Sequence, residues 1–151
     1  MANIGKWNAS TGVITMLSTE LTALGSSTIS AASTTYDNSV NLNIYCDVEV
    51  VINCTGTPVS GSYVALYIWE AIDGTNFPAQ SDADLRLTTT QLFCTIPIGV
   101  TANSAQRVVV RNLVLPPAKF QFKLDNQIQV VLSSTTSNTV RMIPYNINLN
   151  G

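Results

Sequence analysis

The sequence predicts an all-β protein, built as a single antiparallel β-sandwich of the jelly-roll or immunoglobulin-like type with an extended N-terminal arm. Val, Ile and Thr account for 45 of the 151 residues, and β-branched side chains favour strands over helices. Short apolar segments recur about every ten residues between Gly, Pro, Asn and Asp turn signals. The hydrophobic share of 46% lets one domain of this length bury a core.

The first forty residues differ in composition from the rest. Only two charged residues, Lys6 and Glu20, precede Tyr36, and apolar residues are widely spaced among Ser, Thr, Ala and Gly. Leu side chains at 17, 21 and 24 have helical spacing, but the Thr residues between them are poor helix formers. We expect residues 1–40 to form an extended arm with one strand or one helical turn, and residues 41–151 to form the sandwich.

The strand signals sharpen from Asn41 onward. Asn41–Cys54 alternates apolar and polar residues, which predicts a strand with one core face carrying Leu42, Ile44, Cys46, Val48, Val50 and Ile52. Tyr63–Ala71 is apolar on both faces, as expected of a central strand. Asp73–Asn76 predicts a tight turn, and residues 79–90 read as an exposed loop.

The second half predicts five more strands. Pro97 marks the first of them as an edge strand or a strand end. The predicted strands are Leu92–Ile98, Gln106–Leu115, Phe120–Leu124, Ile128–Leu132 and Thr139–Ile147. The predicted core includes Val48, Val50, Ile52, Leu66, Ile68, Val108, Val110, Phe122, Val130 and Ile143.

The composition excludes several functions. The chain has no His, so His-based acid–base catalysis and His metal ligands are absent. Its net charge is −2 and its seven Lys and Arg residues are scattered. The chain therefore lacks the cluster of basic residues that nucleic-acid binding requires. The longest apolar run, Tyr63–Trp69, is too short to span a bilayer, and no secretory signal is recognised at Met1. We expect no enzyme activity, cofactor, metal, nucleic acid or membrane partner.

Several residue groups have a functional and a plainer interpretation. Cys46, Cys54 and Cys94 are expected to be buried apolar residues in a reducing compartment, with a redox or interchain disulfide role as the alternative. Asp82, Asp84 and Arg86 would suit a cation site in a loop, but a solvated charge cluster is favoured.

Two strand faces carry further candidates. Asp47 and Glu49 share one face like the carboxylates of a glycosidase, but nothing supplies a substrate groove. Tyr63, Tyr67 and Trp69 share another face, and with Phe77 they would form a sugar-binding platform, although aromatic residues on a central strand more often fill a core.

Five short motifs resemble segments of small structural proteins of tailed bacteriophages, above all head decoration (cement) proteins, and they cover most of the chain in order. They are Lys6–Trp7, Tyr36–Ser39, the strand and DGTNFP turn of Tyr63–Pro78, the strand Gln106–Arg111, and the LPPAKF turn of Leu115–Phe120. Ala118 stands where that turn usually has Gly.

This resemblance implies a non-enzymatic virion component that decorates and stabilises the capsid. The implied partners are the major capsid protein and further copies of the chain in a homotrimer. The implied location is the capsid exterior, after synthesis in the host bacterial cytoplasm. A phage tail component and a carbohydrate-binding module remain alternatives. As interface residues we predict Ile4, Trp7, Val13 and Ile14 of the arm, and Asp82, Asp84 and Arg86 of the long loop.

Overall fold

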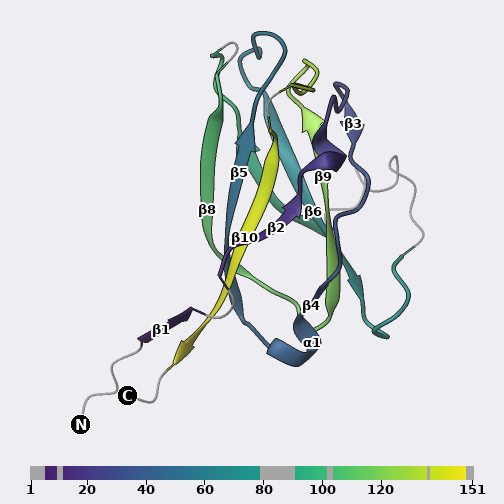
Figure 1. Cartoon of the computed structure of the whole chain (residues 1–151), viewed down its shortest axis with the longest axis vertical. Coiled ribbons are helices and arrows are strands. Elements are labelled where there is room, and N and C mark those ends of the chain that lie inside the picture. The colour runs from purple at the N-terminus through teal and green to yellow at the C-terminus, as the bar shows by residue number, and fades with distance from the viewer. Residues whose placement is uncertain (1–5, 10–11, 79–90, 102–103, 136, 149–151) are drawn as a thin grey trace.

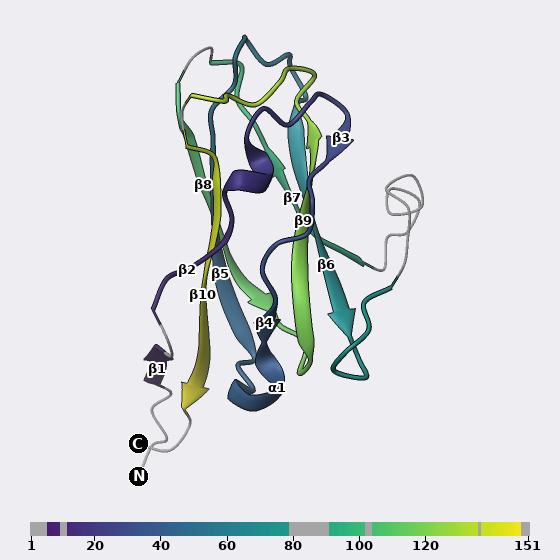
Figure 2. The ribbon, with the colours of Figure 1, turned by 45° about the vertical axis from the view of Figure 1, so that its right-hand side comes forward.

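Two antiparallel sheets pack face to face in this computed structural model, which confirms the predicted β-sandwich (Figures 1 and 2). It describes residues 6–9, 12–78, 91–101, 104–135 and 137–148, with the backbone alone at 6–9 and 148. Sheet A has the order β1-β10-β5-β8, with β2 also paired to β10. Sheet B has the order β3-β9-β6-β7, with β4 also paired to β9.

The described strands and helices have the following bounds. In sheet A they are β1 (Lys6–Ala9), β2 (Ile14–Leu17), β5 (Tyr45–Ile52), β8 (Gln106–Val114) and β10 (Thr139–Asn148). In sheet B they are β3 (Thr28–Ile29), β4 (Tyr36–Asp37), β6 (Tyr63–Ala71), β7 (Leu92–Pro97) and β9 (Lys119–Gln127). A 3-10 turn, η1 (Thr19–Leu21), and a short helix, α1 (Asn38–Asn41), lie between strands. No described helix has the length and apolar character needed to cross a membrane.

The core lies between the sheets and follows the predicted alternation. Six predicted core residues are buried: Val48, Val50, Ile52, Leu66, Ile68 and Phe122. Val108, Val110 and Val130 are partly buried at the margin of the core. Ile143 was predicted wrongly, because Met142 pairs with the inward-facing Val48, so the next side chain points outward and is 39% exposed.

The predicted N-terminal arm is largely part of the sandwich. Ile14–Leu17 pairs with β10, while Met16, Leu17 and Leu21 are buried in the core. The segment then crosses to sheet B, where β3 and β4 pair with β9. Its apolar residues therefore find partners about one hundred residues away, which no local pattern could indicate. Within the described part of this segment, β1, paired with the end of β10, is what projects beyond the sandwich (Figure 2).

This placement gives opposite expectations for two N-terminal deletions. Removing residues 2–9 takes away only β1 among the described strands, so we expect little loss of stability. Removing residues 2–20 also takes away β2 and the buried Met16 and Leu17, so we expect an unfolded or strongly destabilised chain. Thermal unfolding followed by circular dichroism would compare the two, and equal melting temperatures would contradict this placement.

Two further segments differ from the predicted strands. The strand expected from Asn41 begins at Tyr45, because α1 and the left-handed Leu42 (φ 48°) precede it and leave Leu42 and Ile44 exposed. Ile128–Leu132 is no strand. The Asn126 side chain accepts from the Ile128 amide and donates to the Val130 carbonyl, which curls the chain.

A buried amide side chain fixes the α1 region. Asn38 is fully buried, and its Nδ2 donates to the carbonyls of Asn43 (2.8 Å) and Pro116 (2.7 Å). Its Oδ1 accepts from the Asn43 amide at 2.9 Å. The side chain thus ties Asn38 to Pro116, which lies 78 positions later in the chain.

Replacing Asn38 by Ala should leave these buried backbone groups without partners. We expect the free energy of unfolding to fall by about 1–3 kcal/mol, measured by urea denaturation. Asn41→Ala, on the exposed side of the same helix, is the matched control and should change it by less than about 0.5 kcal/mol. Equal effects of the two substitutions would show that the buried network is not what stabilises this end.

Candidate functional site

Three of the motifs that carry the phage resemblance meet at one end of sheet B. Lys119 of the LPPAKF turn lies 3.7 Å from the carboxylate of Asp37 and pairs with Ala71 at the end of β6. The Asn38 amide donates to the carbonyl of Ala118. Ala118 has no positive φ, so this position does not require the usual Gly. The motifs are therefore parts of one structural junction.

The turn after β6 is held by an aspartate. Asp73 Oδ1 accepts from the amides of Thr75 (2.9 Å) and Asn76 (2.7 Å), and Gly74 takes the positive φ that the turn requires. These hydrogen bonds, the Asn76 amide first, lower the pKa of Asp73 to about 2. The neighbouring Ile72 is 88% exposed at the tip. The DGTN motif thus forms a rigid turn that presents an apolar side chain.

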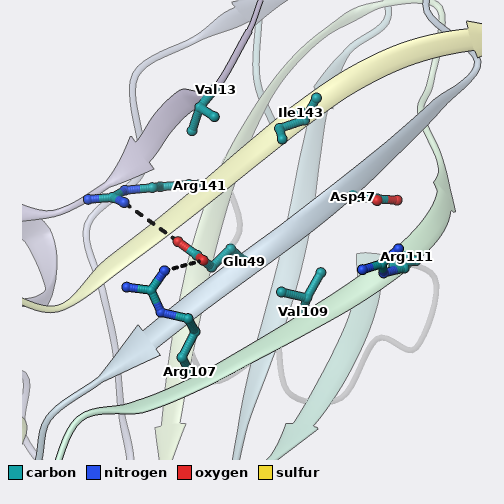
Figure 3. Close-up of a pocket in the computed structure, with 8 residues that line it drawn as sticks. All are labelled: Val13, Asp47, Glu49, Arg107, Val109, Arg111, Arg141 and Ile143. Carbon is teal, nitrogen blue, oxygen red and sulfur yellow. Dashed lines mark hydrogen bonds and ion pairs between the residues drawn. The ribbon is translucent and has the colours of Figure 1, made fainter. Parts of the chain in front are cut away.

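The outer face of sheet A is a second candidate surface. It forms a hollow of about 420 Å³ lined by Val13, Asp47, Glu49, Arg107, Val109, Arg111, Arg141 and Ile143 (Figure 3). The lining comes from β5, β8, β10 and the residue ahead of β2. On the same face lie Val114, paired with Tyr45, and Ile147, at the projecting end of β10. Apolar and charged side chains are therefore mixed on one uncovered sheet.

An ion-pair network lies at the centre of this hollow. Glu49 accepts from Arg107 at 2.8 Å and lies 3.6 Å from Arg141 (Figure 3). These three residues come from β8, β5 and β10, so the network links three adjacent strands. Because the side chains of Arg107 and Arg141 are 63% and 41% exposed, solvent screens both ion pairs and the network adds little to folding stability.

The second carboxylate of the hollow is engaged within the sheet. Asp47 Oδ1 accepts from the Asn112 amide at 3.0 Å and from the Tyr145 hydroxyl at 3.2 Å. Asn112 has a positive φ of 59° at a bulge in β8, which turns its amide toward Asp47. Burial and the nearby Asp47 charge raise the pKa of Tyr145 to about 12. Asp47 is therefore held by Asn112 and Tyr145, and Glu49 by Arg107 and Arg141. Neither carboxylate is left free to act in an acid–base pair.

The outer face of sheet B is different, because its centre is covered. Tyr67 and Trp69 are each only 7% exposed and pack with Ile29 and Phe77. Trp69 Nε1 donates to Gln91 Oε1 at 2.8 Å, and Lys123 Nζ lies 3.9 Å from the centre of its ring. For Tyr67 and Trp69 the structure supports the plainer interpretation, since their rings leave little surface on which a sugar would stack. Tyr63, at the start of β6, is 40% exposed.

The predicted interface residues fall into three groups. Val13 lines the hollow and is 62% exposed, whereas Ile14 packs against the core. The backbone register pairs Trp7 with Ile147. Ile4, Asp82, Asp84 and Arg86 lie outside the described residues.

The sequence interpretation missed the Arg107–Glu49–Arg141 network. The sequence did contain a signal for it. Asp47 and Glu49 share one face of their predicted strand, and Arg107 and Arg111 share one face of theirs. Only the pairing of β5 with β8 and β10 brings these faces together.

The cysteines lie apart from this surface. Cys46 and Cys54 are buried, Cys94 is partly buried, and all three are free thiols. Burial raises the pKa of Cys46 and of Cys94 to about 12, so both remain protonated at neutral pH. Across the described ranges, no three His, Cys, Asp or Glu side chains are grouped so that they would hold a metal ion.

No family model matches this sequence, and no curated protein matches it.

Proposed function

We propose that this protein is a structural component of a tailed-phage virion that decorates the capsid exterior and stabilises the shell as a cement protein. Its partners would be the major capsid protein and further copies of itself, assembled as a homotrimer. The observation that carries the proposal is the uncovered outer face of sheet A. The virion assignment itself comes from the motif resemblance.

The contrast between the two sheets supports a binding role for this face. At the centre of the outer face of sheet B, Tyr67 and Trp69 are packed against their own chain and are each 7% exposed. On sheet A, Val109, Val114 and Ile143 are 39–64% exposed. Arginine is enriched in protein interfaces, and Arg107, Arg111 and Arg141 stand on this face beside the exposed aliphatic side chains. A second protein would remove these side chains from water and so gain the hydrophobic contribution that the isolated chain lacks.

The overall composition also suits contact within a shell. Only 11% of the residues are charged, while Thr, Ser and Asn make up 46 of 151. Neutral hydrogen bonds and apolar contacts are weakly affected by salt, because there is little charge to screen. We therefore expect attachment to a shell to persist at high ionic strength.

Cryo-electron microscopy of virions produced by the genome that encodes the chain tests this function. We expect density for the sandwich on the outside of the head, and heads that lack the protein should release DNA at a lower temperature. Location in the tail alone would replace the cement role by a tail role. Absence of the chain from purified virions would overturn the proposal.

A further inference from the structure

Two charged side chains stand out among those the structure describes, because each lacks a partner. Every other described Asp, Glu, Lys or Arg side chain has a hydrogen bond, an ion pair or a cation–π contact. Arg111 on β8 and Glu70 on β6 have none with the described residues. One is a cation on sheet A, and the other is an anion on sheet B.

Each of these charges lies in a hollow next to exposed apolar side chains. Arg111 lines the hollow of sheet A with Val109 and Ile143, which we call the basic patch (Figure 3). The patch has three arginines and two carboxylates, and both carboxylates are already engaged. The patch therefore has a net positive charge, and Arg111 is the side chain that carries it without a partner among the described residues.

Glu70 lines a second hollow, of about 470 Å³, together with Ile72, Asp73, Asn76, Phe77 and Pro78, which we call the acidic patch. Its two charged residues are both carboxylates, and Asp73 stays ionised over the whole neutral range because its pKa is held at about 2. Ile72 is 88% exposed, the highest value among the large apolar side chains described. The patch thus combines negative charge with a projecting apolar group.

We propose that the basic patch of one copy binds the acidic patch of a second copy, in a head-to-tail contact that pairs Arg111 with Glu70 and places Ile72 in the hollow of sheet A. The proposal concerns the homotrimer part of the proposed function and rests on it only for the expected number of copies. Contact of either patch with the same patch of another copy would bring like charges together, which costs free energy. Opposite charges on opposite sheets favour the head-to-tail arrangement.

Copies joined head to tail form a row, with an unbound basic patch at one end and an unbound acidic patch at the other. Both patches are bound only when the row closes into a ring. A closed ring of three copies would satisfy every patch and present three equivalent surfaces to a shell. The same contact would give open chains if the rotation from copy to copy did not close.

Charge reversal tests the contact on the purified full-length chain, without any capsid. By sedimentation, we expect the unmodified protein to reach a limiting mass three times that of the monomer. Arg111→Glu and Glu70→Arg should each weaken self-association by about ten-fold or more, because each places like charges in contact. The double variant restores an opposite pair and should recover the trimer.

Two further variants complete the experiment. Ile72→Ser should weaken association without changing the charge, and Thr57→Glu, which lines neither hollow, should have no effect. A monomer at all concentrations, or single variants whose loss is not recovered in the double variant, would overturn the contact. Either result would leave the location of the protein on the virion as a separate question for microscopy.

Discussion

Replacing Phe122 by Ala should lower the free energy of unfolding by about 3–5 kcal/mol, the largest loss that we expect from a single truncation in this protein. Phe122 is fully buried on the central strand β9. Its ring centre lies 5.3 Å from that of Phe93 on β7 and 5.4 Å from that of Phe120. Its removal leaves a cavity that the neighbouring strands, fixed by their ladders, fill only in part.

Urea denaturation is the suitable measurement, with the midpoint shifted and the slope unchanged if the native fold is retained. Val114→Ala removes an apolar group that is 64% exposed and should cost less than about 0.5 kcal/mol. A loss below about 1 kcal/mol for Phe122→Ala would contradict the position of this ring at the centre of the core.

The protein should lose stability steeply as the pH rises from about 9 to about 12. Cys46 and Cys94 have a pKa of about 12 in the folded state because burial disfavours the thiolate, against 9.0 for an ordinary thiol. Below pH 9 both states hold the proton, so the stability is fully present. Above pH 9 the unfolded chain releases protons that the folded chain retains, and each thiol contributes a loss of about 1.4 kcal/mol per pH unit.

Denaturation curves at pH 8, 9, 10 and 11 would measure this loss, and the slope against pH is the quantity to compare. Cys46→Ala combined with Cys94→Ala should flatten the slope, even though it lowers the stability at pH 8 through lost packing. Tyr145, whose pKa is also raised to about 12, should leave a smaller residual slope that begins near pH 10. An identical slope in the double variant would exclude the thiols as its cause.

The sequence was most informative where the pattern was local. The alternation in Tyr45–Ile52 and the continuous apolar run of Tyr63–Ala71 predicted β5 and β6, because burial on one face or two is recorded directly in the residue order. The turn at Asp73 was equally clear, since its hydrogen bonds reach only two and three residues ahead.

Prediction failed where the partner lay far along the chain. Leu17 and Leu21 have no local pattern that assigns them to the core, and their burial depends on strands formed more than one hundred residues later. The ion-pair network of the candidate site could not be predicted for the same reason. Arg107, Glu49 and Arg141 meet only through strand pairing, so the sequence showed the charges but not their meeting point.

The position of β10 inside sheet A also sets an order of events during synthesis. This strand lies between β5 on one side and β1 and β2 on the other, although it is the last of the described strands to be made. A growing chain can pair β5 with β8 and assemble sheet B, but β1 and β2 have no partner strand until residues 139–148 leave the ribosome. Nascent chains stalled before residue 139 should therefore remain sensitive to protease at their N-terminal residues, and folding should finish as a single late step.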